Sequence, residues 1–158
     1  MSDLAWIERT VDYDLWAIGQ VLDAIEALPE SDSDDYTRLV SITAHLINTR
    51  GVWLARIQAN PTDLEVFPGP RSVPAMRATL AAIAQDWKDE LAQNLDPHRI
   101  IRYRSSSGDA FENTVHEIAE HVFTHGSYHR GQTAMLIKKL GGTPPATDFI
   151  FFARRSLG

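Results

Sequence analysis

The chain has 158 residues, of which 44% are hydrophobic and 23% are charged, the balance of an ordinary single-domain globular protein. Cysteine is absent, which excludes disulfides, thiolate ligands and a cysteine nucleophile. No apolar run approaches the ~18 residues of a membrane span, and no signal-peptide pattern opens the sequence, so we expect a cytoplasmic protein without a membrane partner. The net charge of -6, with scattered basic residues, argues against a nucleic-acid partner.

The first two predicted helices are each marked by one stripe of apolar residues spaced three and four apart. In the first helix this stripe runs from Leu4 to Leu28, and a proline follows it. A second helix is predicted to begin near Asp35, whose carboxylate can cap the free amides of the first turn. The dipeptide Asn60-Pro61 ends the second stripe and therefore the second helix.

The middle of the chain is predicted to hold a loop, a third helix and a β-hairpin. Residues 61–71 contain three prolines and one glycine, which is typical of a loop. A third helix follows, with Ser72 as its N-cap and Pro74 in its first turn, and its apolar stripe continues to Leu95. Residues 99–112 then break the helical spacing and predict a short hairpin.

The fourth predicted helix opens at Thr114, where Glu117 completes a capping box, and it runs to Leu140. A pair of glycines and a pair of prolines end it. The apolar stretch over 147–155 is expected to pack back on the helices. Four long amphipathic helices predict an all-α fold, an antiparallel four-helix bundle with a short β-hairpin before the last helix, as one domain over residues 1–158.

Polar residues interrupt the apolar seam of the fourth helix. His125, His129 and Gln132 continue the three-and-four spacing at places where the pattern demands Leu or Val. Burying two imidazoles and an amide is costly unless something satisfies them, and neutral imidazole is a common ligand of divalent metals. His45, beside core residues of the second helix, is the best candidate for a third ligand. The sequence therefore predicts a divalent metal site of His45, His125 and His129 with open positions for water.

Several neighbours of these histidines also have an expected place. His121 shares their face but lies one turn further away, which favours partial exposure or a position beside the ligands. Gly126 and Gly131 lie mid-helix, where a missing side chain allows another helix or a substrate to approach closely. Tyr128 and Arg130 flank the last histidine and are placed at the mouth of the site. The tryptophans are assigned to the core: Trp6, Trp16, Trp53 and Trp87.

The stretch 125–132, His-Gly-Ser-Tyr-His-Arg-Gly-Gln, resembles the His-x-x-x-His-Arg-Gly-Gln signature of the DinB family of metalloenzymes. Residues 13–17, Tyr-Asp-Leu-Trp-Ala, are similar to the first-helix motif of that family, and the dipeptide 45–46 matches its second-helix histidine. Residues 140–145 and 147–149 resemble the end of its fourth helix and its tail. The resemblance covers nearly the whole chain.

This resemblance implies a DinB-like bundle whose metal ligands are His45, His125 and His129. It also implies a homodimer and a small-molecule substrate, with the metal activating the thiol of mycothiol, bacillithiol or glutathione in an S-transferase or isomerase. Three imidazoles suit several divalent metals, among which zinc and nickel are expected. The chain departs from the family pattern twice, because Asp14 stands where asparagine is frequent and Arg50 where many members have an acidic residue.

Three alternatives to thiol transfer remain open from the sequence. In the first, the protein is a metal-dependent hydrolase with an activated water as nucleophile. In the second, it is a non-catalytic binding module in which the metal is a structural pin, with His121 as a fourth ligand. In the third, it is a structural bundle without a metal. The candidates for a general base are Asp14, Asn48 and Tyr128, and the sequence does not choose among them.

Overall fold

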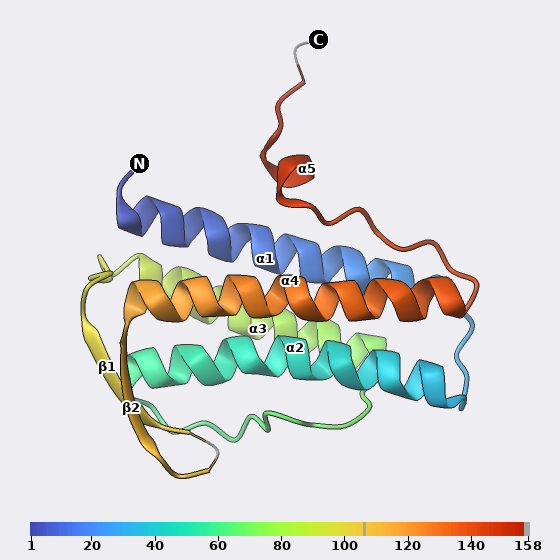
Figure 1. Cartoon of the computed structure of the whole chain (residues 1–158), viewed down its shortest axis with the longest axis horizontal. Helices are drawn as coiled ribbons and strands as arrows, with labels where there is room; N and C mark the ends of the chain where they lie inside the picture. Colours follow the sequence, from blue (N-terminus) through green and yellow to red (C-terminus); the bar gives the residue numbers. More distant parts are fainter. Residues whose placement is uncertain (106, 157–158) are drawn as a thin grey trace.

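The computed structural model describes residues 1–105 and 107–156, and it is mostly helical. Four long helices lie side by side (Figure 1): α1 (Asp3–Glu26), α2 (Asp34–Gln58), α3 (Val73–Leu91) and α4 (Val115–Lys139). Two antiparallel strands connect α3 to α4, and a short helix follows α4: β1 (Ile100–Arg104), β2 (Ala110–Thr114) and α5 (Phe149–Ala153). The helical fold with a hairpin before the last long helix is therefore as predicted.

Each long helix begins after a serine or threonine whose hydroxyl accepts a backbone N–H from the first turn. Thr114 and Glu117 form the predicted capping box, and Ser72 caps α3 with a proline in the first turn. The prediction for α2 was wrong in detail, because the cap is Ser33. Asp35 lies within the first turn instead, where its negative charge interacts favourably with the helix dipole.

The third helix is shorter than its apolar stripe. It ends at Leu91, although the stripe was predicted to carry the helix to Leu95. Asn94 adopts a left-handed conformation with φ of 55°, which turns the chain out of the helix. Leu95 is nevertheless buried at 4% exposure, so the last apolar residue of the stripe packs on the core from a turn.

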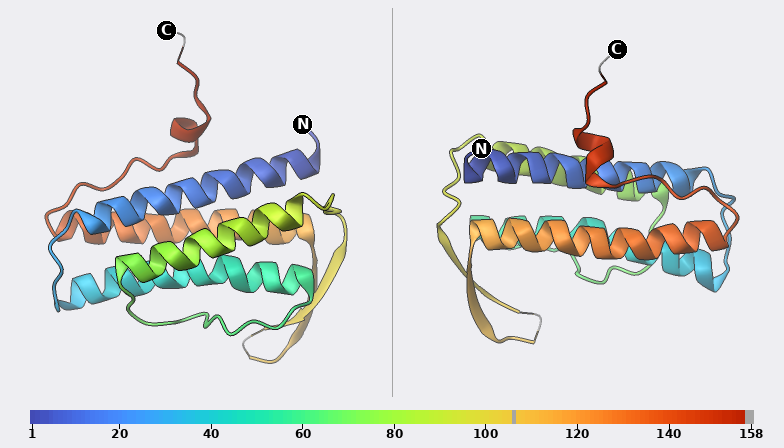
Figure 2. Two further views of the ribbon diagram at one scale, coloured as in Figure 1. Left: turned by 180° about the vertical axis from the view of Figure 1, so that it is seen from behind. Right: turned by 45° about the horizontal axis from the view of Figure 1, so that its top comes forward.

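The helices do not alternate in direction. Asn48 donates to the carbonyl of Glu65, while His45, one turn earlier in α2, contacts the carbonyl of the next residue, Val66. The segment between α2 and α3 therefore runs back along α2, and α3 begins beside the start of α2 (Figure 1). Both views in Figure 2 agree that α2 and α3 run in one direction while α1 and α4 run in the other. This order differs from the antiparallel one predicted from the sequence.

The length of the connection makes this order possible. Residues 59–72 can reach roughly 3.3 Å per residue when extended, which exceeds the length of about 28 Å that the 19 residues of α3 occupy. The segment passes along the outside of α2 and joins two parallel helices, and we call residues 59–72 the crossover segment. It becomes one wall of the site described below.

The C-terminal stretch packs on α1, as expected. Rings of Phe149 and Phe152 lie 5.1 and 5.7 Å from that of Tyr13, and Phe152 also contacts Trp16. The Tyr13 hydroxyl donates to the carbonyl of Thr147 over 2.5 Å. Among the described residues, no helix combines the length and the apolar character that a membrane span requires.

Candidate metal centre

Three imidazoles from α2 and α4 converge between the two helices. The Nε2 atoms of His45 and His125 lie 3.3 Å apart, and those of His129 and His125 lie 3.1 Å apart. Two ligands of a tetrahedral zinc ion, each ~2.0–2.1 Å from the metal, are separated by about 3.3 Å. One ligand nitrogen from each of the three residues lies within 4.8 Å of the others, so the structure brings all three predicted ligands together.

Hydrogen bonds on the outer ring nitrogens orient two of these histidines. Nδ1 of His45 lies 2.5 Å from the carbonyl of Val66 in the crossover segment, and Nδ1 of His129 lies 2.8 Å from Oε1 of Gln132. If each of these two rings carries its proton on Nδ1, each Nδ1–H donates to its own acceptor. The lone pair of each Nε2 is then directed at the space between the three imidazoles, which is the arrangement usual for metal-ligating histidines. Gln132, noted from the sequence as a polar residue in the seam, therefore orients the ring of His129.

The surroundings keep two of the three imidazoles, those of His45 and His125, neutral. Burial lowers the pKa of His125 to about 3, with further contributions from the positive charge of Arg50 and from the neighbouring histidines. Burial also lowers the pKa of His45, although its hydrogen bond to Val66 acts in the opposite direction. Both side chains are therefore unprotonated at neutral pH, and neutral imidazole is the form that binds a metal ion.

A cavity of about 590 Å³ contains the three histidines, with α2 and α4 on one side and the hairpin and crossover segment on the other. Its wall is largely apolar and aromatic. The described residues that line it include no Asp or Glu, and they are His45, Thr49, Val52, Trp53, Arg56, Val66, Phe67, Tyr103, Ser105, Phe111, His121, His125 and His129.

Trp53 therefore belongs to the wall of the cavity, whereas the sequence had assigned it to the core. His121 is exposed and lies at the side of the three-nitrogen group, its ring 5.4 Å from that of His125.

Beneath the histidines lies a buried ionic cluster of Asp14, Arg50 and Arg130, each at most 4% exposed. Arg50 binds Asp14 through two N–H···O contacts of 2.6 and 2.9 Å, and Arg130 donates to the same carboxylate at 2.7 Å. Arg50 also donates to the carbonyls of Leu46 in α2 and Val122 in α4. The cluster thereby ties together the two helices that carry the three histidines.

Sequence reasoning missed this cluster and placed Arg130 at the mouth of the site, which was wrong. The signal was available, because Asp14 lies three residues after Val11 on the buried stripe of α1, and Arg50 lies four residues after Leu46 on that of α2. A charged residue on each of two apolar stripes indicates a buried ion pair. Tyr128 is exposed, as expected near the rim, with its ring 5.1 Å from that of His129.

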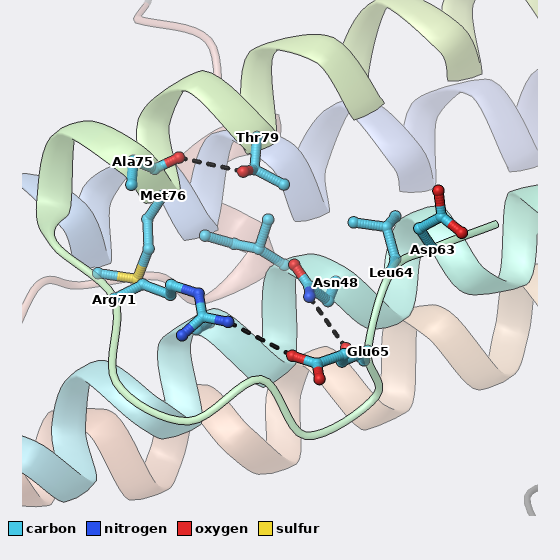
Figure 3. A pocket seen from close by; sticks show the side chains of 10 residues that line it. Asn48, Asp63, Leu64, Glu65, Arg71, Ala75, Met76 and Thr79 are labelled. Carbon is cyan, nitrogen blue, oxygen red and sulfur yellow. Dashed lines mark hydrogen bonds and ion pairs between the residues drawn. The ribbon is translucent and has the colours of Figure 1, made fainter.

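A second pocket lies on the other side of the crossover segment. It has a volume of about 320 Å³ and is bounded by α2, α3 and the crossover segment (Figure 3). Asn48 points into this pocket and donates to the carbonyl of Glu65, whose carboxylate lies 3.4 Å from Arg71. None of the three converging histidines lines it, so Asn48 is directed away from them. The carboxylate of Asp14 is bound by two guanidinium groups. Neither Asn48 nor Asp14 is therefore placed to act as a general base in the cavity.

The fold and the site together define a mostly helical protein with a candidate three-histidine metal centre. The model of the DinB family matches residues 1–156, and the chain belongs to this family. The chain is also 20% identical over 162 residues to Protein DinB of Bacillus subtilis (strain 168), a match that covers 94% of this chain and 93% of that protein. The resemblance noted from the sequence motifs is therefore confirmed.

The two residues at which the sequence departs from the motifs named above form one buried ion pair. Arg50 of α2 contacts the carboxylate of Asp14 in α1, and Arg130 of α4 contacts the same carboxylate. Removal of the carboxylate would leave two buried positive charges unpaired, which is strongly unfavourable.

Proposed function

We propose that this protein is a metal-dependent enzyme of small-molecule thiol chemistry, an S-transferase or isomerase, with zinc or nickel held by His45, His125 and His129. The observation that carries the proposal is the convergence of three Nε2 atoms in an open cavity of about 590 Å³. Three protein ligands leave coordination positions free, as in catalytic sites. A cation bound there would lower the pKa of a coordinated thiol and so supply a thiolate at neutral pH.

The composition of the cavity favours thiol activation over hydrolysis. A metal ion lowers the pKa of a bound water molecule from about 15.7 to about 7, so at neutral pH a carboxylate base is a frequent aid to hydrolysis, and no carboxylate is present among the described residues that line the cavity. A thiol starts from a pKa of about 8.5, so coordination alone is sufficient to make it a thiolate at neutral pH. Val52 and Trp53 offer an apolar surface to an organic ligand, and the charge of Arg50 behind the histidines favours an anion such as a thiolate.

Metal content is the first test of this proposal. Elemental analysis of the untagged protein, purified in the presence of zinc or nickel, should find about one metal ion per chain. The double variant His125→Ala/His129→Ala should contain none. His121→Ala is the matched control, since His121 lies on the same helix at the same cavity and outside the three-nitrogen group, and it should retain the metal.

Two results would contradict the proposal. A wild-type protein without metal, even after incubation with both ions, would show that the three imidazoles do not form a metal site. Loss of the metal in His121→Ala would indicate a closed four-ligand site and favour a non-catalytic module.

The thiol part of the proposal is tested by spectroscopy on cobalt-loaded protein. Addition of glutathione should produce a near-ultraviolet sulfur-to-cobalt absorption band, because a thiol that occupies an open position binds as thiolate. The same titration of the His121→Ala variant should give the same band. If no thiol produces the band, metal-activated thiol chemistry is wrong for this protein.

A further inference from the structure

The cavity that contains the three histidines extends along α2 to one arginine, Arg56. Arg56 follows His45 by eleven residues on the same helix, which places it about 16 Å further along the helix axis. Trp53 lies between the two and faces the same cavity. The cavity is therefore elongated, with a candidate metal centre at one end and a guanidinium group at the other.

Two aromatic rings contact the Arg56 guanidinium. Its central carbon lies 4.3 Å from the centre of the Trp53 ring and 4.7 Å from that of Tyr103, so the group is placed where α2 meets β1. The two rings are edge to face with their centres 5.1 Å apart, so they contact the guanidinium from adjoining sides and leave the remaining sides open. Among the described residues the guanidinium makes one hydrogen bond, a long one of 3.4 Å from Nη2 to the carbonyl of Arg104. A guanidinium carries five N–H donors, so several are available to a ligand.

Arg56 also has no counter-ion in the part of the chain that the structure describes. No carboxylate among residues 1–105 and 107–156 lies within ion-pair distance of it, whereas Arg102 on the adjacent strand pairs with Glu112 at 3.0 Å. Burial lowers the pKa of Arg56, because its charge is incompletely solvated. A half-buried guanidinium in the wall of a cavity, without a carboxylate partner among the described residues, is suited to binding an anion.

We propose that Arg56 recognises the anionic end of the ligand, and that this ligand is an organic acid whose carboxylate binds Arg56 while its other end reaches the three histidines. The inference rests on the proposed function for the role of the histidines. The planar guanidinium matches a carboxylate with two parallel N–H···O bonds, and the flanking rings fix it in advance. Trp53 and Phe111 contact the apolar part of the ligand between the two ends.

The charge preference can be measured with a pair of probes that differ in one group. Calorimetric titration of the zinc-loaded protein with 4-phenylbutyrate and with neutral 4-phenylbutyramide should show binding of the carboxylate that is tighter by about tenfold or more. Arg56→Gln should remove this preference. Arg102→Gln, which neutralises an exposed arginine of β1 outside the cavity, is the matched control and should retain it.

Two outcomes overturn the inference. If the wild-type protein binds both probes equally, Arg56 does not recognise anions. If the preference persists in Arg56→Gln, another group, such as the metal ion, binds the carboxylate. Melting temperature and zinc content establish that each variant is folded. Should Arg56→Gln fail to fold, Arg56→Lys provides the same test, because it retains the charge without the planar fork and should lower the preference severalfold.

Cobalt-loaded protein separates this inference from the proposed function. Glutathione and its dimethyl ester carry the same thiol, and they differ in their carboxylates. Bands from both thiols, with equal affinities in wild type and Arg56→Gln, would leave thiol activation standing and overturn the role of Arg56. If neither thiol produces a band, and the preference for phenylbutyrate still depends on Arg56, thiol activation is overturned and the anion site is supported.

Discussion

At the scale of single residues, the least expected feature is one buried carboxylate shared by two buried guanidinium groups. Asp14 contacts Arg50 and Arg130, so the cluster carries one more positive than negative charge. Nε of Arg130 is buried without a hydrogen-bond partner among the described residues. The positive charge of Arg50 also helps to lower the pKa values of His45 and His125. The cluster therefore fixes the positions of the histidine-bearing helices, and its charge disfavours protonation of the imidazoles.

Asp14→Asn should be strongly destabilising. It leaves two buried arginines without a counter-ion, and breaking a buried ion pair in this way costs about 3–5 kcal/mol. Urea denaturation of the wild-type and variant proteins measures the difference. Glu112→Gln, which removes the exposed pair with Arg102, is the control and should cost less than about 1 kcal/mol. Equal effects in the two variants would contradict the role assigned to the cluster.

The lowered pKa of His125 predicts how the stability of the metal-free protein depends on pH. The folded-state value is about 3, and the ordinary value in an unfolded chain is about 6.5. Between these values the unfolded state binds more protons, so the free energy of unfolding decreases as the pH falls from 6.5 towards 3. Thermal melts in EDTA at pH 7 and pH 5 should show this loss.

The variant His125→Gln isolates that contribution, because it removes the titrating imidazole and retains a polar side chain. Its melting temperature should change less between pH 7 and pH 5 than that of the wild type. His98→Gln, at an exposed loop position, serves as the control and should follow the wild type. Identical pH dependence in all three proteins would show that burial of His125 does not couple to folding.

At the scale of the elements, two glycines of α4 have opposite surroundings. A Cβ atom at Gly126 would collide with Asp14 and Arg50, because the helix backbone lies directly against the ionic cluster. A Cβ atom at Gly131 would meet nothing within 4 Å. The close approach expected from the sequence therefore occurs at Gly126, and its neighbour is a buried ion pair of the protein.

Substitution of these glycines should change stability in opposite directions. Gly126→Ala overpacks the cluster and should cost about 1–3 kcal/mol. Gly131→Ala removes the backbone-entropy penalty of glycine in a helix and should stabilise the protein by about 0.5–1 kcal/mol. Parallel denaturation curves of the two variants provide the measurement. A neutral Gly126→Ala would mean that the cluster moves away without cost.

Hydrophobic spacing was sufficient to predict the four long helices and the three histidines that converge, and insufficient to predict the directions of the helices. A polar residue on an apolar stripe is visible in the sequence, which is why His45, His125 and His129 could be identified. Spacing carries no information about which end of one helix lies beside which end of the next. The direction of α3 depends on the crossover segment, whose contacts with α2 arise only in the folded chain.

At the scale of the whole molecule, the proposed cation should couple two helices that are distant in the sequence. A metal ion that binds the folded state alone stabilises it by mass action, by about 2.7 kcal/mol at a free concentration of one hundred times Kd. For a chain of this size the melting temperature should rise by roughly 5–10 °C on addition of zinc or nickel.

Chelation should reverse that rise, and His125→Ala/His129→Ala should show none of it. Differential scanning fluorimetry with and without EDTA is sufficient for the measurement. An equal rise in the double variant would show that the metal acts elsewhere on the molecule. The same comparison in His121→Ala should reproduce the wild-type rise, because that side chain lies outside the three-nitrogen group.

The crossover segment and the hairpin add Val66, Phe67, Tyr103, Ser105 and Phe111 to the wall of the cavity, while α2 and α4 supply the three histidines. Under the functions proposed above, α2 would carry both a metal ligand and the arginine that binds the anionic end of the ligand. The two connections would enclose the part of the ligand that lies between these ends. Changes of sequence or length in the connections would then alter the size of the molecules that fit, and the chemistry at the two ends of the cavity would stay the same.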